Sequence, residues 1–65
     1  MGMKYIRDSY GVPAKRGGRI KFSPYIGEDP VFGVIVGSKN RYLCVRMDGE
    51  LHTKELHPKW KVEYL

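Results

Sequence analysis

The sequence predicts a small all-β domain of five short strands closed into a barrel, and three observations lead to this prediction. Two runs, 32–37 and 41–47, are rich in β-branched and aromatic residues, which suit the pleated surface of a sheet. The break between them is short and polar, and Asn40 accepts a positive φ at low cost, so the runs are expected to pair as a hairpin. A second turn signal, Asp48-Gly49, indicates a meander of short strands.

The start of the chain shows no clean hydrophobic period. Residues 1–2 resemble an added start and are interpreted as an expression remnant, which leaves 3–18 as an N-terminal extension of a single domain, 1–65. The Gly-Val-Pro segment at 11–13 breaks any helix begun before it. Three apolar side chains of the extension are expected to cover an open edge or one end of the barrel: Tyr5, Ile6 and Tyr10.

Residues 19–22 form the first predicted strand. They alternate strictly between basic and apolar, so Ile20 and Phe22 are expected to face the core. A loop over 23–31 follows, because it contains too many Gly and Pro residues for regular structure. This loop is expected to fold back across the barrel with Tyr25 and Ile26 tucked underneath, and loops of this length are often binding surfaces.

The next two strands supply most of the predicted core. Strand 32–37 is nearly all apolar, and Gly33 is expected to mark a bulge or a sharp bend that helps the barrel to close. In strand 41–47, alternate residues form one apolar face, namely Leu43, Val45 and Met47.

Two shorter strands complete the prediction. The first covers 51–54, with Leu51 and Thr53 on one face. Residues 56–59 form a tight turn, in which the imidazole of His57 is expected to cap a backbone group. The last strand, 60–64, alternates again and places three apolar residues together, which favours Trp60 as a core residue: Trp60, Val62 and Tyr64.

This order of elements is typical of the SH3-like barrel, which KOW-type modules also use. The OB-fold shares part of the pattern, but it usually has a helix between its third and fourth strands. The interval between Met47 and Leu51 is too short for that helix. The predicted fold is therefore a small five-stranded SH3-like barrel.

Four segments carry a resemblance to a known family: Tyr-Gly-Val-Pro-Ala-Lys-Arg-Gly at 10–17, Gly-Val-Ile-Val-Gly at 33–37, Arg-Met-Asp-Gly-Glu at 46–50 and His-Pro-Lys-Trp at 57–60. Together they resemble a family of very small uncharacterised phage and prophage proteins, over roughly residues 10–65. The resemblance implies a phage or bacterial cytoplasmic setting and carries over no functional residue. A looser similarity to KOW modules suggests contact with nucleic acid or a ribonucleoprotein.

The formal charge of +5 is concentrated in the first third of the chain. Residues 1–22 hold six basic residues against Asp8 alone, whereas 23–65 hold equal numbers of basic and acidic residues. Such a patch attracts anions and favours nucleic acid or an acidic partner. The alternative interpretation is that the charge belongs to an ordinary soluble surface rich in lysine.

The predicted function is that of a non-enzymatic binding module that contacts nucleic acid without strong sequence preference. The residues expected to follow a phosphate backbone are Lys15, Arg16, Arg19, Lys21, Lys39 and Arg41. Tyr25 and Tyr42 are expected to stack on bases, and Trp60 is a third candidate for stacking, although the core is the favoured place for it. The alternative is a protein-interaction or assembly module, including a homo-oligomer, that uses strand edges and aromatic residues.

Few residues suit catalysis or metal binding. Cys44 could meet His52 or His57, but no motif orients them and their spacing is not that of a metal site, so Cys44 is expected to pack as a small hydrophobe. No cofactor, metal or small-molecule substrate is expected. A single cysteine allows no internal disulfide and is compatible with a reducing cytoplasm, and neither a membrane span nor a signal peptide is expected. The bacterial host cell is implied by the resemblance alone.

Overall fold

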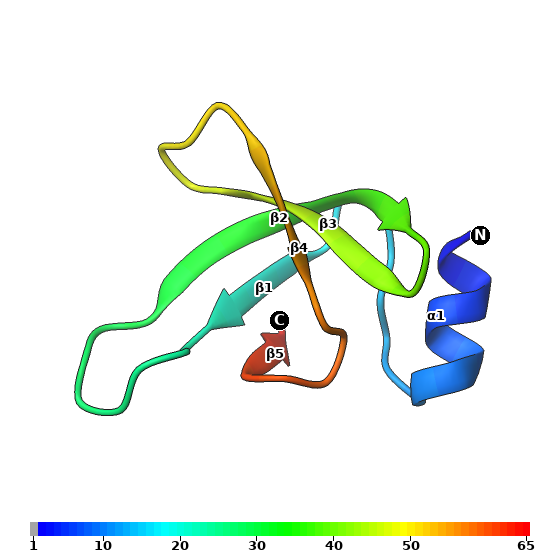
Figure 1. The fold of residues 1–65 in the computed structure, drawn as a ribbon, viewed down its shortest axis with the longest axis horizontal. Helices are drawn as coiled ribbons and strands as arrows, with labels where there is room; N and C mark the ends of the chain where they lie inside the picture. Colours follow the sequence, from blue (N-terminus) through cyan, green and yellow to red (C-terminus); the bar gives the residue numbers. More distant parts are fainter. Residues whose placement is uncertain (1) are drawn as a thin grey trace.

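The computed structural model describes residues 2–65, which form one antiparallel sheet of five strands and one short helix (Figure 1). The elements are α1 (Met3–Tyr10), β1 (Arg19–Phe22), β2 (Val31–Lys39), β3 (Tyr42–Met47), β4 (Thr53–Leu56) and β5 (Val62–Tyr64). The strand order is β4-β3-β2-β1-β5, and every neighbouring pair is antiparallel. Within 2–65 no ladder joins β4 to β5, so the five predicted strands form an open, curled sheet rather than a closed barrel.

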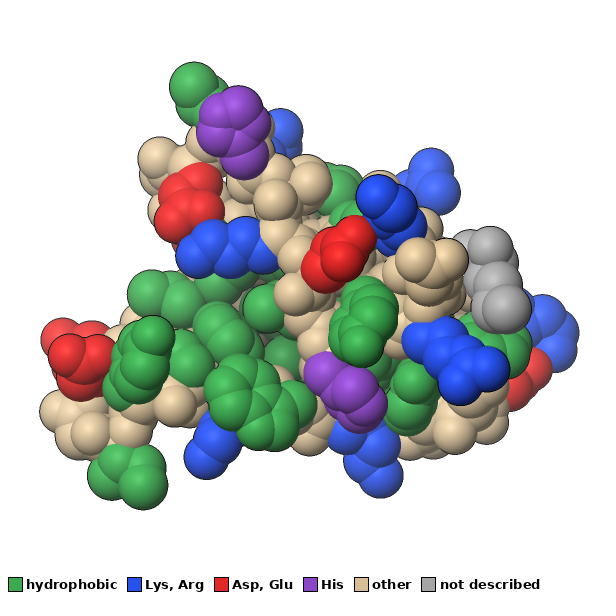
Figure 2. All heavy atoms as spheres, viewed as in Figure 1, with side chains coloured by type: hydrophobic (Ala, Val, Ile, Leu, Met, Phe, Trp, Pro, Cys, Tyr) green, Lys and Arg blue, Asp and Glu red, His purple; other side chains and the backbone are tan. Residues whose placement is uncertain are grey.

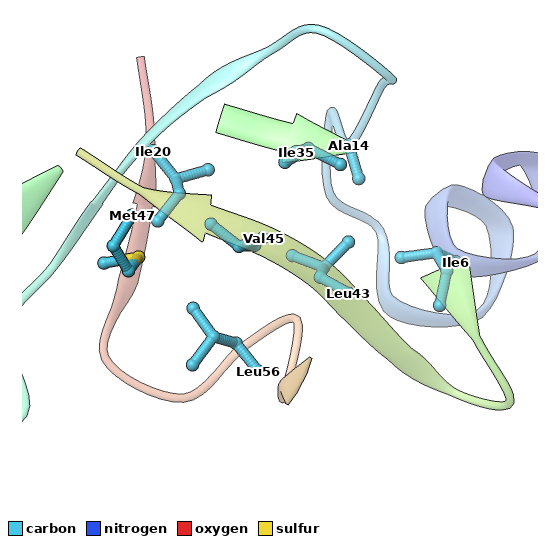
Figure 3. Packing of buried hydrophobic residues seen from close by; sticks show 8 residues of the cluster. All are labelled: Ile6, Ala14, Ile20, Ile35, Leu43, Val45, Met47 and Leu56. Atoms are coloured by element: carbon cyan, nitrogen blue, oxygen red, sulfur yellow. The ribbon is translucent and has the colours of Figure 1, made fainter. Parts of the chain in front are cut away.

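The helix α1 is the element that the sequence did not predict. It ends where the sequence indicates, because Gly11 adopts a left-handed conformation (φ 65°) and its N–H donates to the carbonyl of Arg7 at 2.8 Å. Ile6 is completely buried, and Figure 3 shows it reaching from α1 toward Leu43 on β3. A helix this short is not stable alone in water, so its burial against the sheet holds it in place. The same contact fulfils the expectation that Ile6 covers one end of the core.

The core lies on one face of the sheet and is closed at one end by α1 (Figures 1 and 3). Its buried apolar residues are Ile6, Ala14, Ile20, Ile35, Leu43, Val45, Met47 and Leu56. The alternation in β1 and β3 therefore assigned Ile20, Leu43, Val45 and Met47 correctly. Phe22 is only half-buried.

The hairpin β2–β3 forms as predicted, with Asn40 at φ 57° in its turn. Gly33 does not mark a bulge: it pairs in register with both Ile20 and Met47. The irregularity in β2 lies further along, between Ile35 and Gly37. The bend was thus expected in the correct strand but at the wrong glycine.

Predictions for the last third of the chain need three corrections. β4 begins at Thr53 rather than at 51, and Leu51 is 92% exposed in the turn before it. Leu56, expected in a turn, ends β4 and is buried. Trp60 precedes β5 and is 52% exposed, so its assignment to the core was wrong. Pro58 is buried in that turn instead.

The loop that connects β1 to β2 also differs from expectation. Tyr25 is 68% exposed and Ile26 is 97% exposed, so neither is tucked beneath the loop. Gly27 turns the chain at φ 86°. The loop therefore projects its apolar side chains into solvent.

The one helix within 2–65, α1, is far too short to cross a bilayer.

Candidate functional site

Three rings open to solvent surround a shallow hollow of about 350 Å³ beside the turn that joins β4 to β5. Tyr42, at the start of β3, and His57 and Trp60, in that turn, supply the rings, and Lys59 completes the lining. We call these four residues the ring surface. Figure 2 shows this side of the molecule, with apolar surface, a histidine and basic side chains next to one another.

The imidazole of His57 is held on both sides. The rings of Tyr10 and Tyr42 meet it edge-on, with centroid separations of 5.2 and 6.3 Å. Its Nδ1 accepts the backbone N–H of Lys59 at 3.1 Å, which confirms the prediction that this imidazole caps a backbone group. Because Nδ1 is an acceptor, the proton of the neutral ring is assigned to Nε2.

The rest of the turn is fixed by backbone hydrogen bonds. The N–H of Trp60 donates to the carbonyl of His57 at 3.2 Å, and the N–H of Ser23 donates to the carbonyl of Lys61 at 3.0 Å. The hydroxyl of Tyr64 donates to the carbonyl of the buried Pro58 at 2.7 Å, and burial raises the pKa of Tyr64 to about 12. The ring surface thus stands on an ordered turn.

Three exposed cations belong to the ring surface or adjoin it in the sequence, and they have no carboxylate partner, as is also true of Lys15, Arg16, Lys21 and Arg46 elsewhere within 2–65. Within 2–65, Arg41, Lys59 and Lys61 form no ion pair, and all three are exposed. Lys61 has a left-handed backbone (φ 61°), a conformation that a lysine adopts at a cost. Lys59 thus brings a cation without an ion pair into the ring surface, and Arg41 and Lys61 each follow or precede one of its residues in the chain.

Several residues predicted to bind phosphates lie on the outer face of the sheet instead. Arg19 and Lys21 project there from β1, opposite Val34 and Phe32. Asp48 accepts two hydrogen bonds from Arg19, each 2.8 Å long; they lower the pKa of Asp48 and raise that of Arg19. Arg19 is therefore already compensated, whereas Lys21 on the same face forms no ion pair within 2–65.

The remaining predicted cations are spread over the molecule. Lys15 and Arg16 are exposed in the segment before β1, and the Arg16 guanidinium lies over Gly37, 3.8 Å from where a Cβ would be. Lys39 ends β2 and lies 3.8 Å from a carboxylate oxygen of Glu55. Arg41 alone of the six lies next to the ring surface in sequence, since it precedes Tyr42.

Three basic positions were not predicted from the sequence, namely Arg46, Lys59 and Lys61. Arg46 pairs in register with Val34, which places it in the same outer row as Arg19. The alternation of β3 already placed it opposite the core face, so that signal was present. Lys59 was missed because Trp60 beside it was expected in the core.

Of the two tyrosines expected to stack on bases, only Tyr42 belongs to the ring surface. Tyr25 lies at a second hollow, of about 400 Å³, between the loop 23–30 and Trp60. Phe22 and Trp60 contribute to its wall, with ring centroids 5.9 Å apart, and Glu28 and Asp29 add two carboxylates. Trp60 separates the two hollows.

No group of three or more His, Cys, Asp or Glu residues suited to a metal ion occurs within 2–65. Cys44 is half-buried in β3, paired in register with Gly37 and Glu55. Cys44 alternates with the buried Leu43 and Val45, so its thiol projects from the other face of the sheet.

Comparison of the chain with models of protein families, with curated proteins and with solved structures finds no match. The function proposed below therefore depends on the geometry and charge of the ring surface.

Proposed function

We propose that the protein is a non-enzymatic module that binds single-stranded nucleic acid through the ring surface. The observation that carries the proposal is the coincidence of three solvent-open rings with cations that have no carboxylate partner within 2–65. Bases stack on exposed aromatic side chains, and each stacked base contributes about 1–3 kcal/mol. Lysine and arginine beside the rings neutralise the phosphates that connect those bases.

The form of the surface favours a single strand over a duplex. Only one helix occurs within 2–65, and its Ile6 is committed to the core, so it is not a free recognition helix for a major groove. Stacking on a ring needs an unpaired base, and every base offers a face for it. We therefore expect binding that is tolerant of sequence.

The fold assignment that accompanies this proposal is an SH3-like barrel, in which the sheet curls without a β4–β5 ladder. The strand order and the tight turn before β5 support it. The resemblance to phage and prophage proteins supports a setting in the cytoplasm of a bacterial host.

A salt titration with fluorescent single-stranded DNA and RNA oligonucleotides tests the proposal. Three cations near the rings predict a slope of about −2 for log affinity against log salt, since each phosphate contact on a single strand contributes about −0.7. Trp60→Ala is expected to weaken binding at least about fivefold through lost stacking. Replacing Arg41 and Lys59 with Ala together should flatten the salt slope.

The matched control removes two of the cations expected from sequence, Lys15 and Arg16. This double variant loses two positive charges, as does the variant in which Arg41 and Lys59 are replaced. If it weakens binding more than the variant beside the rings, the site belongs at the N-terminal third rather than at the ring surface. An absence of binding at low salt would reject nucleic acid as the partner.

A protein-interaction or assembly module, including a homo-oligomer, is the second candidate. It is favoured by the outer edges of β4 and β5, which have no ladder partner within 2–65, and by exposed apolar residues near the sheet such as Phe32 and Val31. A stable dimer by light scattering at micromolar concentration, together with no oligonucleotide binding, would support it.

A further inference from the structure

The second hollow, between the loop 23–30 and Trp60, has the chemistry of a cation site rather than of an anion site. We propose that it binds an alkylated ammonium group, of the kind carried by choline or by a methylated lysine side chain. The site goes beyond the nucleic-acid proposal and shares with it only Trp60. We call it the aromatic hollow and define it by Phe22, Tyr25, Glu28, Asp29 and Trp60.

Three aromatic side chains from separate parts of the chain line the aromatic hollow. Phe22 ends β1, Tyr25 belongs to the following loop, and Trp60 belongs to the turn before β5. The rings of Phe22 and Trp60 are inclined at 55°, so they form two walls rather than a stack. Tyr25 and Trp60 both keep more than half of their surface open to solvent. Ring faces open in this way attract an ammonium group through their quadrupoles.

Glu28 and Asp29 also line the hollow, so the loop that borders it carries two negative charges. The chain has seven acidic residues, and four of them are in ion pairs: Asp8, Asp48, Glu50 and Glu55. Glu28 and Asp29 have no ion pair within 2–65, and they lie side by side in one loop. In a chain of charge +5, this hollow therefore combines unpaired negative charge with three rings.

A tight turn of the loop brings the backbone of Glu28 next to that of Tyr25. The N–H of Glu28 donates to the carbonyl of Tyr25 at 3.5 Å, and Gly27 between them turns the chain at φ 86°. Figure 2 shows apolar surface between this projecting loop and the body of the molecule, and acidic side chains at the outer tip of the loop.

One cation, Lys54, also lines the aromatic hollow. Its amine lies 3.6 Å from a carboxylate oxygen of Glu50, so part of its charge is compensated by a residue outside the hollow. The remaining charge opposes an ammonium ligand and would favour a phosphate. Lys54 therefore provides a test of the sign of the ligand: its removal strengthens the binding of a cation and weakens that of an anion.

The experiment uses the full chain and four probes. Trp60 fluorescence and amide NMR spectra are followed during titration with choline and with the neutral tert-butyl isostere of choline. A short peptide carrying trimethyl-lysine and the same peptide with unmodified lysine form the second arm. We expect choline to bind at least about fivefold more tightly than its isostere, because the two differ only in charge. The two peptides show whether the ligand is a methylated lysine side chain or an ammonium group of a free small molecule or a lipid headgroup.

Variants then assign the site. Tyr25→Ala and the pair Glu28→Gln with Asp29→Asn are each expected to weaken choline binding about fivefold or more, and Lys54→Met to strengthen it. Glu63→Gln is the matched control, because Glu63 is also without an ion pair within 2–65 but does not line the hollow. Tyr25 is largely exposed, so its replacement does not threaten the fold.

Three results would overturn the inference. They are equal binding of choline and its isostere, unchanged or tighter binding after the two carboxylates are neutralised, and weaker binding in Lys54→Met. Measuring oligonucleotide binding by Tyr25→Ala distinguishes a failure of this inference from a failure of the nucleic-acid proposal. Tyr25 does not belong to the ring surface, so the affinity of this variant for nucleic acid should not change.

Discussion

Gly33 has no Cβ atom, and this absence allows β1, β2 and β3 to pack closely at its position. It lies in β2 between Ile20 of β1 and Met47 of β3. A Cβ at this position would be 2.8 Å from both Met47 Sδ and Val45 Cγ1, and 2.9 Å from the carbonyl oxygen of Arg46. The side chains could move, but the carbonyl belongs to the sheet and cannot.

Gly33→Ala is therefore expected to lower the free energy of unfolding by about 2 kcal/mol or more, within the range seen for overpacked cores. Urea denaturation measures the change. Gly2→Ala is the control, because no atom lies within 4 Å of the added Cβ there, and its effect should stay within about 0.5 kcal/mol. Equal effects of the two substitutions would contradict the close approach.

Tyr64 makes the stability of the protein sensitive to alkaline pH. Burial raises its pKa in the folded state to about 12, from an ordinary value of 10.0. Between these values the unfolded chain releases the proton and the folded chain keeps it, so stability falls as pH rises from 10 toward 12.

Tyr64→Phe should reduce this alkaline loss while lowering stability at neutral pH by about 1 kcal/mol, because the hydrogen bond to the Pro58 carbonyl is removed. Denaturation curves at a series of pH values measure both effects. An alkaline slope identical to that of the unaltered protein would show that Tyr64 does not cause it.

Among the elements, α1 is not joined to the sheet by a ladder of hydrogen bonds, so its position depends on the burial of one side chain, Ile6. Ile6→Ala is expected to cost about 2–4 kcal/mol, because it leaves a cavity beside Leu43. Lys4→Ala on the same helix removes an exposed ion pair to Asp8 and should cost no more than about 0.5 kcal/mol. Thermal unfolding compares them, and similar losses would mean that α1 is not anchored through Ile6.

The turn before β5 has a lysine, Lys61, at a position where glycine would make the folded protein more stable. Lys61 has φ 61°, so Lys61→Gly should raise the free energy of unfolding by about 0.5–1 kcal/mol. If Lys61 contacts phosphates, the same substitution weakens oligonucleotide binding, so stability and affinity change in opposite directions. Lys59→Ala is the comparison, with weaker binding and no gain in stability. A loss of stability in Lys61→Gly would contradict this account.

At the scale of the whole molecule, folding and the proposed binding depend on different groups. All four ion pairs within 2–65 are exposed, and the buried core within these residues is entirely apolar. Exposed pairs contribute little and are screened by salt. Raising NaCl from about 50 mM to about 500 mM should change the free energy of unfolding by less than about 1 kcal/mol, while oligonucleotide affinity falls steeply. A parallel loss of both would indicate that salt weakens the fold rather than the contact with phosphate.

Local patterns determined the strands of this protein. The period of two in β1 and β3 correctly assigned Ile20, Leu43 and Met47 to the core, because alternate side chains of a strand face the same side. Asn40 and Gly49 have positive φ in the predicted turns, since these residue types accept it cheaply. The capping role of His57 was also readable, because it acts over two residues of sequence.

Only the tertiary structure decided what covers the ends of the sheet. One buried contact of Ile6 stabilises α1, and such a contact leaves no period in the sequence. Pro58 is buried in the turn and β5 begins after Trp60, so the tryptophan stays in solvent between the two hollows. Alternation specifies which side of a strand a residue faces. It does not specify where the strand begins, and because β5 begins after Trp60, this residue is exposed rather than part of the core.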